Sequence, residues 1–264
     1  MLYSDHPRVR YQRAQLAEVI CQLRFPAILS ISANEPAEFQ EAVRGMFPRY
    51  AAKEESPAPR LADLGTSKAR LEQPKSIINY HFISADGRWK LNLTSNFISL
   101  STVSYPGWEA FGQHFDLPLA QFIRIYKPAF FERIGLRYVN IFSRRTLELE
   151  GEPWRELIAG PYLGILSEED VDESAARKCA VDVELNLDSS CRVKLHAGPG
   201  MVKPNVPNAP QDPEVKFILD MDLFMAGQID PRMAAAGLET LHGHSTPLFQ
   251  GAITDKLHSA LEPQ

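Results

Sequence analysis

The sequence has few cysteines and no long hydrophobic run. Cys21, Cys179 and Cys191 are spread over 264 residues, without the close, paired spacing of a disulfide or metal framework. We interpret them as small buried side chains of a reducing compartment. No stretch of 18 apolar residues is present, so we expect no membrane-spanning helix. The segment Met1–Tyr11 lacks the apolar region of a secretory signal. These absences predict a cytoplasmic protein.

Known catalytic and phosphate-binding motifs are also missing. The chain has no GxSxG elbow, no HExxH pair and no recognisable Cys–His arrangement. The proline-rich segment His196–Pro213 contains AGPG, which matches neither phosphate-loop spacing. A net charge of −5 disfavours broad nucleic-acid binding, which depends on neutralising phosphates. We therefore lean towards a non-enzymatic protein and predict no metal and no cofactor.

Alternating apolar residues predict a protein rich in β-strands. In Ala180–Leu187, valine and leucine alternate with acidic or amide side chains, the period of a half-buried strand. Similar patterns predict strands at Leu16–Phe25, Ile77–Ser84, Trp89–Thr94, Phe97–Val103, Phe131–Phe142, Cys191–Ala197 and Val215–Met225. Short turns such as Asp86-Gly87 and Asp188-Ser189-Ser190 join neighbouring strands, which predicts antiparallel pairing.

Helical spacing and long loops complete the expected order of elements. Helices are predicted from Asn34, as a cap, to Pro48, at Trp108–Lys127 with a kink or division at Pro118, at Pro153–Ile158 and at Ile229–Leu261. Residues 51–75 and 198–213 are interpreted as long loops because of their charges and prolines.

Both halves of the chain show the same order of elements. We predict an α+β fold built from a duplicated β-α-β-β-β-α unit, with an antiparallel curved sheet and two long helices covering one face. The expected single domain, residues 1–264, contains two pseudo-repeats at about 14–130 and 131–262.

Four segments, LAEVICQLRFP, GRWKLNL, ERIGLRYVNIF and LFQGAITDKLH, occur in this order over most of the chain. In them the sequence resembles a sporadically distributed family of prokaryotic proteins, and RIGLRYVN is the most specific part. The resemblance implies a common fold and no established activity, so it provides no catalytic residues. The element order is also similar to saddle-shaped TBP-like folds and to helix-grip ligand pockets, an analogy that does not fix function.

The main candidate site is a polar, arginine-bearing face of the sheet. Arginine offers a planar fork for carboxylate or phosphate, and tyrosine and asparagine add hydrogen bonds. The candidate binding residues, beside which Arg133 could lie, are Arg24, Trp89, Lys90, Arg137, Tyr138 and Asn140. We expect an anionic small ligand or a protein partner there. In the structural alternative Arg137 pairs with an acidic neighbour on the next strand and Tyr138 fills the core.

A second hypothesis concerns carboxylates on two strands. Asp182, Glu184, Asp220 and Asp222 could meet on one face and hold Mg²⁺ or Ca²⁺ in a hydrolase or nuclease. A half-solvated sheet shows the same alternation without any metal, and Lys194 and Lys216 could neutralise these acids.

Weaker candidates are histidines and basic residues near the chain ends. His242, His244 and His258 could approach a metal, although exposed histidines explain them as well. Arg8, Arg10 and Arg13, with Tyr11 between them, could contact nucleic acid, which the acidic balance disfavours. Exposed sheet edges would also allow a homodimer.

Overall fold

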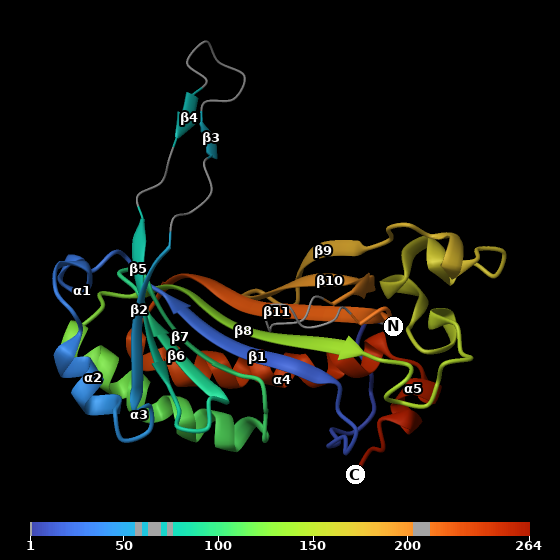
Figure 1. The fold of residues 1–264 in the computed structure, drawn as a ribbon, viewed down its shortest axis with the longest axis horizontal. Helices are drawn as coiled ribbons and strands as arrows, with labels where there is room; N and C mark the ends of the chain where they lie inside the picture. The colour runs from blue at the N-terminus through green and yellow to red at the C-terminus, as the bar shows by residue number, and fades with distance from the viewer. Residues whose placement is uncertain (1, 56–59, 63–69, 73–75, 203–211) are drawn as a thin grey trace. The chain divides into compact units, whose positions relative to one another are not determined.

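The computed structural model describes residues 2–55, 60–62, 70–72, 76–202 and 212–264. These residues form a mixed α+β fold with a nine-stranded antiparallel sheet, in the order β2-β5-β6-β7-β1-β8-β11-β10-β9 (Figure 1). Its strands are β1 (Leu16–Arg24), β2 (Arg49–Glu55), β5 (Ile77–Ile83), β6 (Trp89–Leu93), β7 (Phe97–Thr102), β8 (Phe131–Phe142), β9 (Val181–Asn186), β10 (Cys191–Met201) and β11 (Val215–Ile229). The predicted α+β class and antiparallel sheet are confirmed.

The other described elements are helices and a short two-stranded ladder. The ladder pairs β3 (Arg60–Ala62) with β4 (Arg70–Glu72). The α-helices are α1 (Leu29–Ala33), α2 (Ala37–Val43), α3 (Trp108–Tyr126), α4 (Ala234–Ala252) and α5 (Asp255–Ala260). Short 3₁₀ helices lie at Trp154–Glu156, Gly160–Tyr162, Gly164–Ser167, Glu173–Ala175 and Pro231–Met233. Among the described helices, none is long and apolar enough to cross a membrane.

The chain divides into two compact units. Unit 1 comprises Met1–Ile20, Ile134–Ala226 and Met233–Gln264, and unit 2 comprises Cys21–Arg133 and Gly227–Arg232. Strands β1, β8 and β11 therefore contribute residues to both units. The duplicated unit, the single domain with two pseudo-repeats and the covering of one sheet face by two helices stay predictions.

In unit 1, helix α4 packs against strands β8 and β11 (Figure 1). The rings of Phe142 and Phe249 lie 6.1 Å apart. A Cβ atom at Gly237 would lie 3.4 Å from Met225 Sδ and 3.5 Å from Ile134 Cδ1. The absence of a side chain at Gly237 therefore lets the helix approach these strands closely.

In unit 2, aromatic side chains join helices α2 and α3 to the strands. Trp89 stacks on His114 of α3 with ring centroids 3.9 Å apart, and Phe39 of α2 meets Phe82 edge-on at 5.4 Å. These large rings supply most of their stabilisation through burial of apolar area. Trp89 is consequently a core residue of unit 2, 7% exposed.

The prediction of one long loop over residues 51–75 is wrong for its first part. Residues 49–55 form β2, which pairs with β5 so that Ala52 lies opposite Tyr80. Every residue of β2 is exposed, so the segment has none of the alternation by which a half-buried strand is recognised. Backbone pairing with a distant strand makes it a strand. Residues 56–59, 63–69 and 73–75 lie outside the described residues.

Three further local predictions need correction. Strand β10 continues to Met201, so residues 198–201 belong to a strand paired with β11, and 203–211 lie outside the described residues. Helix α3 runs through Pro118 without division, while a kink there stays a prediction. Asn34 ends α1, and the residue preceding α2 is Pro36, which provides no side-chain cap. For β10 the reason is pairing with β11, which local propensity does not reveal.

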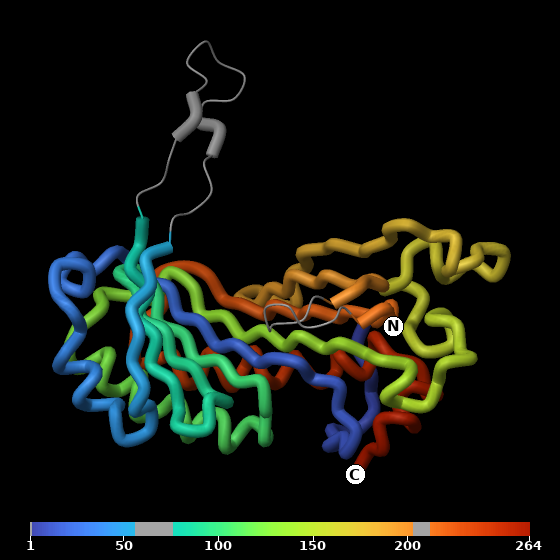
Figure 2. Tube along the Cα trace, in the orientation of Figure 1, coloured from blue at the N-terminus to red at the C-terminus, as the bar shows by residue number. Residues whose placement is uncertain are grey.

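The N-terminal segment of unit 1 runs beside the C-terminus of the chain (Figure 2). The Gln264 backbone amide donates to the Arg10 carbonyl oxygen at 2.8 Å, and the Gln12 amide donates to the Glu262 carbonyl at 3.1 Å. Tyr11 Oη shares a hydrogen bond of 2.9 Å with His258 Nδ1. This part of the basic N-terminal segment is thus packed against the rest of unit 1.

Candidate functional site

The outward side of strands β8 to β11 in unit 1 carries a set of charged side chains. Buried residues alternate with more exposed ones along β11 and the first part of β10, as a period of two requires, whereas β9 contains no buried residue. In β10, Val193, Leu195 and Ala197 are buried, so Lys194 and His196 point to the opposite side. The charged face, as we call it, comprises Arg137, Asp182, Glu184, Lys194, His196, Asp220 and Asp222, which line an open depression of ≈ 450 Å³ together with Val183 and Leu195.

Strand register arranges the charged face in two rows, in which a basic side chain lies between two carboxylates. His196 lies between Asp182 of β9 and Asp220 of β11, and its Nδ1 is 2.7 Å from Asp182 Oδ1. Lys194 lies between Glu184 and Asp222, with its Nζ 3.6 Å from Glu184 Oε2. Cross-strand pairs of opposite charge stabilise a sheet.

Arg137 completes the first row from strand β8. Its Nε donates to Asp220 Oδ1 at 2.7 Å, and its Nη2 donates to Asp220 Oδ2. The hydrogen bond to Asp220 raises the pKa of Arg137 above its ordinary value. The Arg137 guanidinium, which the sequence analysis expected to bind an external anion, is thus occupied by Asp220. This pairing is the one that the structural alternative predicted.

The three residues of the expected arginine-bearing patch that lie in unit 1 do not share one face of their strand. Tyr138 and Asn140 are 6% and 5% exposed and point into the core of unit 1, whereas Arg137 points outward. The reason is that adjacent residues of a strand face opposite sides. Asn140 Nδ2 donates to the Leu219 carbonyl oxygen at 3.3 Å.

The other three residues of that predicted patch lie in unit 2. Trp89 is buried against His114. Arg24 is exposed and donates from Nε to Gln22 Oε1 at 2.8 Å. Lys90 is half-buried on β6, in register with Ser101 of β7. Their roles in binding stay predictions.

The four strand carboxylates do share one face, as their alternation predicts. Asp182, Asp220 and Glu184 each contact a cationic or imidazole side chain rather than one another. Among the described residues, no three of the four carboxylates bring oxygens within 4.8 Å of one another. One divalent ion at ordinary bond lengths of about 2.3–2.6 Å needs closer ligands, so the geometry does not support the alternative metal-dependent hydrolase.

The three C-terminal histidines have separate surroundings in unit 1. His242 is buried, its Nδ1 sharing a hydrogen bond of 2.8 Å with Tyr138 Oη, and Arg8 contacts its Nε2. His258 contacts Tyr11. His244 instead reaches the turn between β9 and β10. The idea that these histidines share a metal is therefore not supported, although one of them belongs to another cluster.

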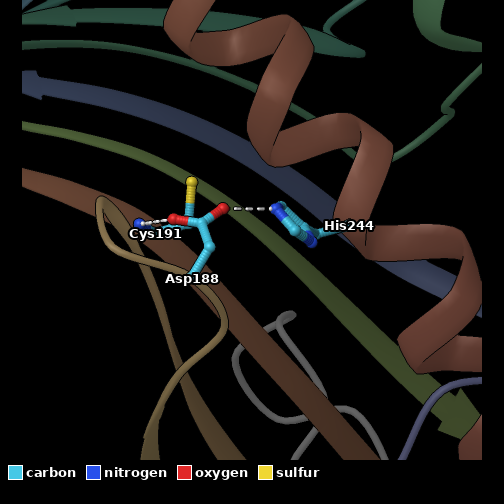
Figure 3. Close-up of side chains that lie close together, drawn as sticks. All are labelled: Asp188, Cys191 and His244. Atoms are coloured by element: carbon cyan, nitrogen blue, oxygen red, sulfur yellow. Dashed lines mark hydrogen bonds and ion pairs between the residues drawn. The ribbon is translucent and has the colours of Figure 1, made fainter.

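This cluster comprises Asp188, Cys191 and His244 (Figure 3). One ligand atom from each residue lies within 4.8 Å of the other two, the one such group among the described residues. Asp188 Oδ1 accepts hydrogen bonds from the backbone amides of Ser190 and Cys191 at 2.6 and 2.7 Å. Its Oδ2 lies 2.9 Å from His244 Nε2. The turn thus fixes one carboxylate oxygen and presents the other to helix α4.

Burial and the turn also shift the pKa values of Asp188 and Cys191. The Ser190 and Cys191 amides hold the pKa of the Asp188 carboxyl well below its usual range. Burial raises the pKa of the Cys191 thiol, whose side chain is 0% exposed. A catalytic cysteine needs an accessible thiolate, so this arrangement does not fit a nucleophilic triad. Residues of this kind are metal ligands in many proteins.

Sequence reasoning missed this cluster although it noted both of its parts. The Asp188–Ser190 turn and His244 are 56 residues apart in the chain, so no short spacing connects them. The only features of the sequence that pointed to the cluster were the predicted turn at Asp188–Ser190 and the predicted helical position of His244. In comparisons with known proteins, no protein-family model and no curated protein matches this chain.

Proposed function

We propose that this protein is a binding module whose charged face and strand β9 engage an extended, positively charged segment of a partner protein. The observation that carries the proposal is the charge imbalance of the depression. Four carboxylates face the permanently cationic Arg137 and Lys194 in the depression, and Arg192 beside it pairs with Glu184. One negative charge is left in excess when His196 is neutral. Opposite potentials steer association and select partners.

Strand β9 adds a second argument for an extended ligand. It is the last strand of the sheet order, so one side of its backbone has no neighbouring strand among the described elements. Val183 and Leu185 are 38% and 36% exposed on its other face. A peptide that adds a strand to such an edge gains main-chain hydrogen bonds, while its alternate side chains reach the two faces.

The proposal keeps the sequence-based expectation of a non-enzymatic binding protein with an arginine on the sheet face. It replaces the expected anionic ligand by a cationic one. An anion would have to displace Asp220 from Arg137 and enter a face with excess negative charge. A lysine or arginine of a partner meets neither obstacle.

Fluorescence anisotropy with labelled synthetic peptides tests this function. We expect an alternating lysine–valine peptide to bind, an alternating glutamate–valine peptide not to bind, and affinity to fall as salt rises. The double substitution Asp220→Asn and Asp222→Asn should weaken binding. A matched control, Glu168→Gln with Glu169→Gln, makes the same change in net charge at exposed positions outside the charged face. Equal weakening by the two variants, or equal binding of the two peptides, would contradict the proposal.

A further inference from the structure

We infer that Asp188, Cys191 and His244 form a Zn²⁺ site, with Asp188 Oδ2, Cys191 Sγ and His244 Nε2 as its protein ligands. Zn²⁺ accepts thiolate, imidazole and carboxylate ligands together, and sites with three protein ligands leave one position for water. The mixture of sulfur, nitrogen and oxygen donors favours Zn²⁺ over Mg²⁺ or Ca²⁺, which prefer oxygen alone.

The distances suit a tetrahedral ion. Bond lengths of about 2.0–2.3 Å place tetrahedral ligand atoms about 3.3–3.6 Å apart. One ligand atom from each of the three residues lies within 4.8 Å of the other two, and Asp188 Oδ2 and His244 Nε2 are 2.9 Å apart. These separations are close to those of a tetrahedral ligand set.

The ligands come from firmly held elements. Asp188 is fixed by the amides of Ser190 and Cys191. Cys191 begins β10, where it lies opposite Met225 of β11. His244 belongs to α4, next to the turn of helix that contacts Tyr138 through His242. Groups that orient the ligands in this way strengthen metal binding.

The surroundings of Tyr3, which lies beside the cluster, independently support a ligand at this place. The Tyr3 ring centroid lies 6.5 Å from that of His244. The Tyr3 hydroxyl is buried and has no hydrogen-bond partner among the described residues. A buried hydroxyl normally has a partner.

The full-length chain, treated with a chelator and titrated with Zn²⁺ against a chromophoric competitor, tests the site. We expect one ion per chain. Cys191→Ser and His244→Gln should each weaken binding more than about tenfold, since changes outside the ligand set alone cost about 10–100-fold. Tyr3→Phe should weaken it less. Cys179→Ser and His196→Gln, which alter a cysteine and a histidine of unit 1 outside the cluster, should leave the affinity unchanged.

Co²⁺ in place of Zn²⁺ reports on the sulfur ligand directly. We expect thiolate-to-cobalt charge-transfer absorption in the wild type and in Cys179→Ser, and its loss in Cys191→Ser. Circular dichroism of the metal-free variants establishes that they are folded, and His244→Gln, at a half-buried position, tests the site if Cys191→Ser does not fold. Absence of stoichiometric Zn²⁺ binding by the wild type, or wild-type affinity in both ligand variants, would overturn the inference.

Discussion

Tyr138 and His242 join strand β8 to helix α4 through a hydrogen bond of 2.8 Å between Tyr138 Oη and His242 Nδ1. Both side chains are buried, at 6% and 5% exposure. Arg8 contacts the other ring nitrogen, Nε2. The imidazole is therefore bonded on both sides, and it links the N-terminal segment, the strand and the helix of unit 1.

Loss of the Tyr138 hydroxyl should destabilise the protein. Tyr138→Phe leaves the buried His242 Nδ1 without this partner, so we expect the free energy of unfolding to fall by about 1–3 kcal/mol. Tyr162→Phe is the matched control, because the buried Tyr162 hydroxyl has no hydrogen-bond partner among the described residues. Its removal should be neutral or stabilising. Urea denaturation measures both variants, and equal losses would refute this account of the hydrogen bond.

Two glycines of strand β10 should respond differently to alanine. A Cβ at Gly198 would lie 2.5 Å from the Cys179 carbonyl oxygen, whereas a Cβ at Gly200 would meet Ile218 Cδ1 at 3.5 Å, an ordinary contact. Gly198→Ala should therefore cost about 1–3 kcal/mol of stability through overpacking. Gly200→Ala should have little effect or stabilise the strand. Thermal unfolding compares the two, and a smaller loss at Gly198 than at Gly200 would contradict the close approach.

The pair of Arg137 and Asp220 should contribute modestly to stability. The Arg137 side chain is 45% exposed, so solvent weakens the attraction despite the bidentate geometry. A double-mutant cycle of Arg137→Gln and Asp220→Asn should give a coupling energy of about 1 kcal/mol or less, decreasing with salt. The more exposed pair of Arg232 and Asp230 should give a smaller coupling. A larger value for the exposed pair would show that the geometry of Arg137 contributes nothing.

Asp212 should make stability depend on pH in the acid range. The Lys216 side chain, the Glu214 backbone amide and Arg145 lower the pKa of Asp212 to about 2, below its ordinary value of 3.8. Its stabilising contribution is therefore present above pH 3.8 and is lost as the pH falls towards 2. We expect wild type and Asp212→Asn to differ most in free energy of unfolding above this range and to converge below it. A difference in free energy of unfolding between the two proteins that does not change with pH would disprove this role of Asp212.

Much of the charged face could be predicted from the sequence. The alternation in residues 180–187 and 215–225 predicts that Asp182 and Glu184 share one side of their strand, as do Asp220 and Asp222, and all four line the same depression. In β11 the buried residues lie on the opposite side, whereas β9 has no buried residue. This works because the side-chain period of a strand is a local property. The same rule separates Arg137 from Tyr138, which the expected binding patch had grouped together.

The tertiary structure decided everything that depends on which strands are neighbours. Strand β2 has no apolar alternation, and pairing with β5 alone makes it a strand. Arg137 meets Asp220, 83 residues further along the chain, because β8 and β11 are adjacent in the sheet. Such pairings follow from the packing of the whole chain and leave no short spacing in the sequence.

Turns can be predicted from a few neighbouring residues, whereas the position of a helix relative to a distant turn cannot. The sequence by itself determined the α+β class, the strand faces and the turn at Asp188. Only the packing of α4 against the sheet of unit 1 brought His244 to Asp188 and Cys191. The physical reason is that burial of apolar surface, which is non-directional and acts between distant segments, sets where a helix lies.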